Sequence, residues 1–265
     1  GAHVMAAPLP FLLHLADDAL VLGQRNAEWC GHGPAIEEDI AMANVSLDLI
    51  GQARLLYQLA AQRLGDGATE DQLAYFRDAD AFLNHTLVEL PHSGPLVGHA
   101  QTDRDYATTI ARNFLHGAFN LLRWDALCAS SDAELAAIAA KSVKEARYHL
   151  RHARGWLIRL GDGTAHSHDR MQAALDHLMP YTQEFWLTTP EESQGVSDGV
   201  LPQTPDQWQA AWDELVDDAV SQAGLRRPSS QGHVSQGKCG LHSEHLSYLL
   251  AEMQSLARAH PGAQW

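Results

Sequence analysis

Nearly every long segment of this 265-residue chain repeats its apolar residues at helical spacing, and this periodicity limits the fold more than any other feature. The alternating Val-, Ile- and Thr-rich runs that are typical of strands are absent. Segments with glycine and proline separate the periodic stretches. The pattern predicts helices at 9–30, 35–64, 70–87, 104–129, 132–160, 167–188, 205–223 and 241–259. Several long helices joined by mostly short loops predict an all-α bundle.

No shift in composition divides the chain, so we predict a single helical domain at 6–265. The first five residues, GAHVM, have the form of a cloning scar that ends in the native start methionine, and they are left out of the fold prediction. The segment 226–240 is rich in Gly, Ser and Gln, which predicts a mobile loop.

The chain is acidic, with a formal net charge of −15. Nucleic acids and anionic membranes both need a basic surface, so neither is expected as a partner. No apolar run approaches the roughly 20 residues that cross a bilayer. Three separated cysteines, Cys30, Cys128 and Cys239, favour neither disulfides nor a zinc motif. We therefore expect a reduced protein of the cytoplasm.

Polar residues interrupt the apolar faces of the long predicted helices. In the second helix, Asn44, Asp48 and Gln52 follow one another at i, i+4 and i+8. Burial of such groups costs about 2–7 kcal/mol each unless they have partners, so partners are expected. Two interpretations are open: a hydrogen-bonded network that fixes helix register, or a metal or ligand site or its remnant.

The other long helices show the same pattern. The polar residues that share an apolar stripe there are Asp17 and Gln24 in the first helix, Asn113, His116 and Asn120 in the fourth, and Glu145, Tyr148, His149 and His152 in the fifth. Four such helices together indicate a bundle with a polar interior.

A di-iron site in a helical bundle needs a glutamate from each of two helices and Glu-x-x-His from each of the other two. Here the corresponding segments are Asp48-x-x-Gly51 and Glu145-x-x-Tyr148, and the other two helices offer the amides of Gln24 and of Asn113 or Asn120. Two irons need several anionic ligands, which neutral amides cannot supply. The one literal Glu-x-x-His, Glu89 to His92, contains a proline and is interpreted as accidental. The sequence therefore predicts no di-iron centre and no metal in this chain.

Several ordered blocks resemble the family of C-type subunits of phenylacetyl-CoA epoxidases. The most specific are LGQRNAEWCGHGPAIEEDIAMANVSLDLIGQARLLYQLAA at 22–61 and KEARYHLRHARGWLIRLGDGT at 144–164. Further blocks are NHTLVELP, DYATTIARNFLHGAFN and HLSYLLAEMQSLARAHPGAQW, at 84–91, 105–120 and 245–265. The sequence departs from the family pattern at 92–104, where the link into the next helix is longer.

The resemblance implies a ferritin-like four-helix bundle core with additional helices. It further implies a structural, non-catalytic subunit that supports a related A-type catalytic subunit, together with further small subunits. In that family, the A-type subunit holds the di-iron site and converts phenylacetyl-CoA to its ring 1,2-epoxide with molecular oxygen. Electrons come from NADPH through a reductase that carries FAD and an iron–sulfur cluster. This chain itself is expected to hold no cofactor. The oligomeric state of the isolated chain is left open by the sequence, with a homodimer as one option because two-fold pairing is common among soluble oligomers.

By position, Asp48 and Glu145 match acidic residues of a degenerate di-iron site. We predict no catalytic residues, and a polar network that replaces the metal: Gln24, Asn44, Asp48, Gln52, Asn113, Asn120, Glu145, Tyr148, His149 and His152.

Two other functions remain open. The first is a divergent metal-dependent oxygenase that uses Glu145, His149, His152, Asp48 and Glu38. The second is a module that binds a CoA ester through the arginines at 147, 151, 154 and 159, which the helical pattern places on a solvated face.

The tryptophans at 124, 156, 186, 208 and 212 are predicted to lie in the core.

Overall fold

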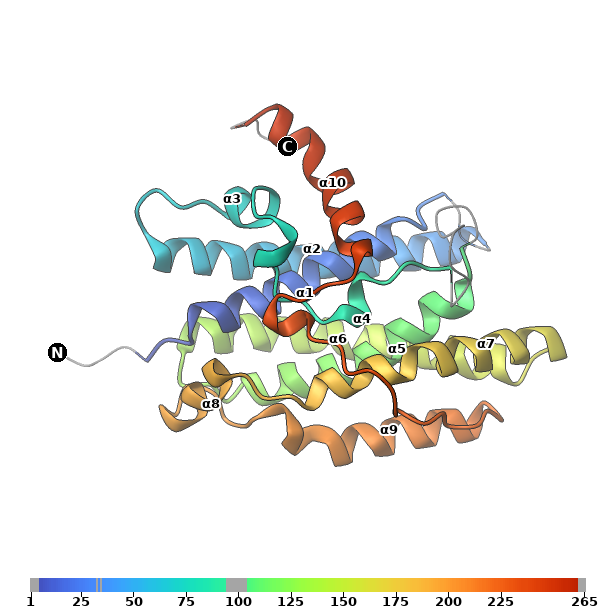
Figure 1. Ribbon diagram of the computed structural model, residues 1–265. Helices are drawn as coiled ribbons and strands as arrows, with labels where there is room; N and C mark the ends of the chain where they lie inside the picture. The colour runs from blue at the N-terminus through green and yellow to red at the C-terminus, as the bar shows by residue number, and fades with distance from the viewer. Residues whose placement is uncertain (1–4, 32, 34, 94–103, 262–265) are drawn as a thin grey trace. The chain divides into compact units, whose positions relative to one another are not determined.

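The computed structural model describes residues 5–31, 33, 35–93 and 104–261. Most of the predicted N-terminal scar, and residues 94–103 of the link predicted to be longer than in the family, lie outside this range. The described residues form helices and no strand, apart from one isolated bridge between Gln236 and Leu241 (Figure 1). None of the described helices is long and apolar enough to cross a membrane. The predicted all-α class is confirmed.

The chain forms two compact units, which are described separately. The central unit consists of Gly1–Ala7 and Pro91–Val234. The split unit consists of two stretches distant in sequence, Pro8–Leu90 and Ser235–Trp265. A single domain at 6–265 stays a prediction.

The split unit is built on a hairpin of two long helices, α1 (Leu9–Ala27) and α2 (Ile36–Leu64), which lie side by side in Figure 1. Their contact is close, because the Ser46 hydroxyl donates to the carbonyl of Gly23 at 2.8 Å. The smaller helices of this unit are α3 (Glu70–Tyr75), α4 (Thr86–Glu89), α10 (Glu244–Ala259) and two 3-10 turns at Ala79–Ala81 and Gly237–Cys239.

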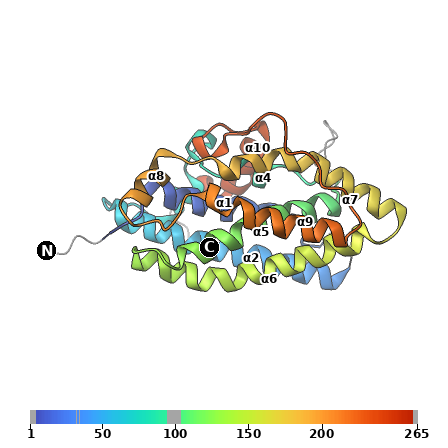
Figure 2. The same ribbon diagram turned by 90° about the horizontal axis from the view of Figure 1, so that it is seen from below.

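The central unit is built on a second pair of long helices, α5 (Tyr106–Leu127) and α6 (Ala133–Gly161) (Figure 2). The remaining helices are α7 (Ala165–Leu178), α8 (Pro190–Ser197), α9 (Gln209–Gln222) and 3-10 segments at Met179–Trp186 and Pro205–Trp208.

Aromatic side chains fill the core of the central unit. Phe119 stacks on Phe185 with ring centroids 4.4 Å apart, and the Trp212 indole donates to the carbonyl of Leu115 at 3.0 Å. Of the tryptophans predicted to be core residues, Trp124, Trp208 and Trp212 are buried, whereas those at 156 and 186 are half-buried.

Five of the predicted helices match observed ones to within three residues at each end: α1, α2, α5, α6 and α10. The prediction of one helix at 70–87 is wrong, because this stretch divides into α3, a 3-10 turn and α4. The helix predicted at 167–188 changes to 3-10 geometry at Met179, next to Pro180. The stretch 189–205, predicted to be loop, contains α8, which begins with a capping box between Thr189 and Glu192.

Candidate functional site

The polar residues predicted in the split unit differ in burial. Gln52 is buried, and Gln24 and Asp48 are half-buried. Asn44 is exposed, so the expectation that it faces inward is wrong. The buried stripe of α2 runs through Met42, Val45, Ser46, Leu49, Gln52, Ala53 and Leu56. Asn44 is about 140° around the helix from the middle of that stripe.

In the central unit, Asn113, Asn120 and His149 are buried, while Glu145 and His152 are half-buried. The side-chain oxygen of Asn120 accepts a hydrogen bond from Arg123 at 3.0 Å.

Tyr148 is 43% exposed, so its predicted inward position is wrong. The buried stripe of α6 passes through Val143, Ala146, His149 and Leu150, and one residue before His149 the side chain already points outward.

The donor set at the positions expected for two irons does not fit a di-iron centre. Gly51 has no side chain, and Tyr148, at the other histidine position, faces solvent. Asn113 and Asn120 are neutral amides. The remaining carboxylates, Asp48 and Glu145, are too few to balance two iron ions.

Three of the four arginines on the outer face of α6, those at 147, 154 and 159, make ion pairs or ring contacts within the central unit. Arg154 reaches Asp218 at 2.7 Å, and the Arg159 guanidinium lies over the Trp156 ring. Arg147, Arg151 and Arg159 are exposed, as predicted for a solvated face.

Asp17, noted in the sequence as a polar residue on an apolar stripe, lies at the centre of a buried network. It accepts a hydrogen bond from the Tyr57 hydroxyl, forms an ion pair with Arg77, and accepts the backbone N–H of Leu83 at 2.9 Å. Burial raises the pKa of the Asp17 carboxyl, and Arg77 and the hydrogen bonds oppose that rise. Burial and the nearby Asp17 charge raise the pKa of Tyr57 well above its usual value. This arrangement ties α1, α2 and the segment after α3 together.

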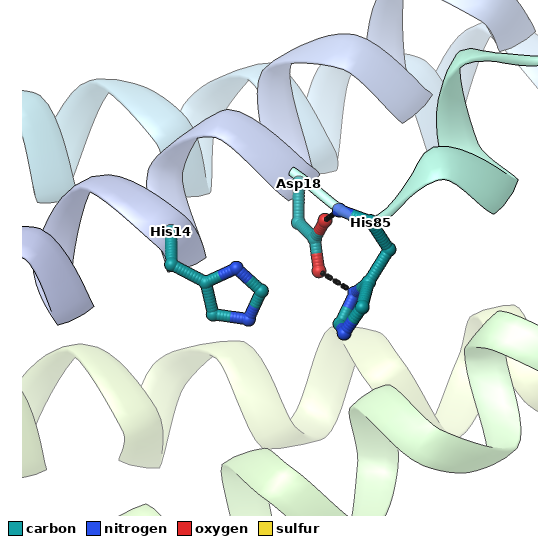
Figure 3. Close-up of side chains that lie close together, drawn as sticks. All are labelled: His14, Asp18 and His85. Atoms are coloured by element: carbon teal, nitrogen blue, oxygen red, sulfur yellow. Dashed lines mark hydrogen bonds and ion pairs between the residues drawn. The ribbon is translucent and has the colours of Figure 1, made fainter. Parts of the chain in front are cut away.

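A second group, which the sequence analysis missed, consists of His14 and Asp18 on α1 and His85 just before α4 (Figure 3). All three are buried, and one ligand atom from each lies within 4.8 Å of the other two. Among the described residues, it is the one group of at least three His, Cys, Asp or Glu side chains that converges in this way. The signal in the sequence was the i,i+4 spacing of His14 and Asp18.

A third buried group surrounds Glu89, whose carboxylate accepts from the Ser243 hydroxyl at 2.6 Å and contacts a His242 ring nitrogen at 2.7 Å. The Asn84 amide also donates to Glu89, at 3.1 Å. His92 accepts hydrogen bonds from the Thr109 hydroxyl and from Arg112 in the central unit. Each member of the Glu-x-x-His pair therefore has partners of its own, as expected if the motif is accidental.

Comparison with known proteins identifies the family. A family model described as "Phenylacetic acid catabolic protein" matches residues 3–265. The chain is 44% identical over 255 residues to the C-type subunit of 1,2-phenylacetyl-CoA epoxidase from Escherichia coli (strain K12). The alignment covers 96% of this chain and 98% of that protein. A ferritin-like bundle is consistent with this family. The chain therefore belongs to the phenylacetic acid catabolic protein family.

Proposed function

We propose that this chain is the non-catalytic structural subunit of a ring-1,2-phenylacetyl-CoA epoxidase. The observation that carries the proposal is the near full-length match to the C-type subunit of such an enzyme, at 44% identity over 96% of this chain. A match that extends to both ends of the relative supports the same place in the assembly rather than a shared fold alone.

The composition of the polar positions supports a non-catalytic role. Glycine and an exposed tyrosine stand where a di-iron helix needs histidines, and asparagines stand where carboxylates are needed. Oxygen activation and phenylacetyl-CoA binding then belong to an A-type catalytic subunit, which holds the two irons. NADPH would deliver electrons through a separate FAD and iron–sulfur reductase, and this chain would contribute no cofactor to the reaction.

The oxygenase alternative has weaker support. It requires Glu145, His149 and His152 on α6 to converge with further ligands. A two-iron site would need a histidine three residues after Glu145, and the exposed Tyr148 stands there. The CoA-binding alternative rests on exposure alone: Arg147, Arg151 and Arg159 are exposed, while Arg154 is paired with Asp218.

Reconstitution tests the proposal. We expect this chain, co-expressed with the catalytic subunit, to elute with it as one complex whose mass is measured by light scattering. With the reductase, NADPH and phenylacetyl-CoA, the complex should form epoxide that carries one atom from ¹⁸O₂, detected by mass spectrometry. This chain alone should form none and should contain no stoichiometric iron.

Two conservative variants separate support from catalysis. The complex reconstituted with Asp48→Asn or Glu145→Gln should turn over within about twofold of wild type, because neither carboxylate takes part in the chemistry. Loss of turnover in a variant that still assembles with the catalytic subunit would contradict the proposal. Two irons bound to the isolated chain would contradict it as well.

A further inference from the structure

One side of α2 is apolar although it faces solvent. Ile36, Ile40 and Leu47 are 71%, 57% and 67% exposed, and Ala43 lies on the same side of the helix. This outer stripe is about 160° around the helix from the middle of the buried stripe. A helix with apolar residues on both sides normally packs against a second neighbour. Exposed apolar patches of this kind mark places where another molecule binds.

We propose that the outer stripe of α2, residues 36–54, pairs with the same stripe of a second copy of this chain. The two helices run antiparallel, around a two-fold axis between residues 45 and 46. An interface with two-fold symmetry needs one surface that is complementary to itself, and the stripe has this property in both size and charge. The proposal concerns the chain by itself and does not depend on its role in the epoxidase.

Large and small side chains of the stripe match when one copy is reversed. Residues at equal distances on either side of the axis then face each other, so Ile40 meets Gly51 of the other copy. Leu47 meets Asn44 and the neighbouring Ala43. A Cβ atom on Gly51 would have nothing within 4 Å, so this glycine leaves room for a side chain of another molecule. Packed helices interlock in this way, with large residues of one against small residues of the other.

The two ends of the stripe carry opposite charges. The first turn of α2 contains Glu37, Glu38 and Asp39, and Arg54 lies at the other end with its side chain 65% exposed. In the antiparallel pair, Arg54 of each copy lies at the level of Glu37 of the other. Arg54 also contacts Glu70 of its own chain at 3.3 Å, and a guanidinium has five N–H donors, enough for both carboxylates. A parallel pair would bring like charges together, so the charges favour the antiparallel direction.

The acidity of the chain limits the strength of the pairing. A net charge of −15 makes two copies repel each other. From Ile36 to Gly51 the outer stripe carries no ionisable side chain, so this repulsion is not concentrated where the helices meet. One pair of helices is also a small interface, and small interfaces are weak. We therefore expect a dimer that dissociates on dilution to about 1 µM.

Sedimentation velocity of the full-length chain between about 1 and 100 µM tests the proposal. We expect wild type to be a dimer at the upper concentration. Leu47→Glu places a carboxylate of each copy against apolar side chains near the axis, so it should weaken association at least 100-fold. Leu241→Glu is the matched control, because Leu241 is 64% exposed and belongs to the same unit but lies outside α2. It should dimerise as wild type does.

Two single charge variants test the antiparallel register. Glu37→Arg alone and Arg54→Glu alone each place like charges at the same level, so each should weaken self-association about 10-fold. Mixed in equal amounts, the two variants should associate within about threefold of wild type, because every contact then joins opposite charges again. Both positions are exposed, and thermal unfolding followed by circular dichroism checks that the variants fold. A mixture that associates no better than either variant alone overturns the proposed register.

A wild-type chain that stays monomeric at about 100 µM overturns the proposal, and so does a dimer that Leu47→Glu leaves unchanged. Co-expression with the catalytic subunit identifies the other occupant in that case. If the monomeric wild type elutes with the catalytic subunit and Leu47→Glu does not, the stripe binds that subunit and not a second copy.

Discussion

At the scale of single residues, the Asp17–Arg77 pair is the interaction whose loss should matter most. Asp17 is completely buried, and the Arg77 side chain is 14% exposed and lies over the Phe82 ring. Arg77→Met leaves a buried carboxylate without its cation, so we expect the free energy of unfolding to fall by about 3 kcal/mol. Urea titration followed by circular dichroism measures this loss.

A surface ion pair is the control for that variant. Arg226 reaches Asp176 at 3.1 Å with both side chains well exposed, so Arg226→Met should cost less than about 1 kcal/mol. If the two variants lost equal amounts of unfolding free energy, the buried pair would stabilise the protein no more than the exposed pair does.

His177 should make the protein less stable in acid. Burial, together with the nearby Arg112 guanidinium, lowers the pKa of His177 below its ordinary value of 6.5. As the pH falls below about 6.5, the unfolded chain takes up this proton before the folded chain does, so the free energy of unfolding decreases. The decrease stops once the pH is below the folded pKa.

A comparison of the pH dependence of the unfolding free energy in wild type and in His177→Gln isolates this effect, because the other groups titrate equally in both proteins. We expect the acid slope of the unfolding free energy between pH 6.5 and 5 to be shallower in the variant. A variant with the same slope would exclude His177 as the cause.

Some residues could be assigned to buried positions from the sequence, and others could not. Asp17 and Gln52 could be assigned to inward positions because each follows the apolar period of its own helix. Asn44 and Tyr148 could not, because one residue on a helix turns the side chain by about 100° and the apolar stripe is broad. The role of His85 depends on Asp18, 67 residues earlier, and no local pattern carries that information.

At the scale of elements, the break in the predicted helix 70–87 has a tertiary cause. The backbone N–H groups of Leu83 and His85 donate to Asp17 and Asp18 on α1. In a continuous helix these groups would be bonded to carbonyls four residues earlier. The Arg77 guanidinium also donates to the carbonyl of Leu73, at the end of α3. Buried carboxylates of α1 therefore compete with the helical hydrogen-bond pattern at 83–85.

The segment 235–243 packs tightly against α4 at one glycine, which yields an element-scale prediction. A Cβ atom on Gly237 would lie 2.3 Å from the carbonyl oxygen of Asn84 and 2.8 Å from the amide nitrogen of Thr86. Both are backbone atoms, so the segment must move. Gly237→Ala should cost about 1–3 kcal/mol of unfolding free energy. It should also speed amide exchange at Ser243, whose N–H donates to Glu89.

Gly155→Ala is the control for this substitution. Gly155 lies on α6, and nothing is within 4 Å of the position of its Cβ. Alanine there should stabilise the protein by about 0.5–1 kcal/mol, because it raises helix propensity without a clash. If Gly237→Ala is as harmless as this control, the close approach to Asn84 does not constrain the segment.

At the scale of the whole molecule, the path of the chain couples the two units. The split unit joins 8–90 to 235–265, for example through Glu89 and Ser243. If residues 91–234 unfolded alone, they would form a long flexible loop within the split unit. Closing a loop of that length costs roughly 4 kcal/mol of chain entropy. The split unit is therefore expected to lose stability when the central unit unfolds.

This coupling predicts one cooperative transition, as the proposal of a single domain requires. The chain has seven tryptophans, and those at 124, 156, 186, 208 and 212 belong to the central unit. In a Trp29→Phe, Trp265→Phe variant, fluorescence reports on the central unit alone. The urea concentration at the midpoint of the fluorescence change reports unfolding of the central unit. Amide exchange in α1 and α2, measured by mass spectrometry across the same titration, reports unfolding of the split unit, and the two midpoints should coincide. Separate midpoints would mean that the units unfold independently, and the single-domain prediction would then be wrong.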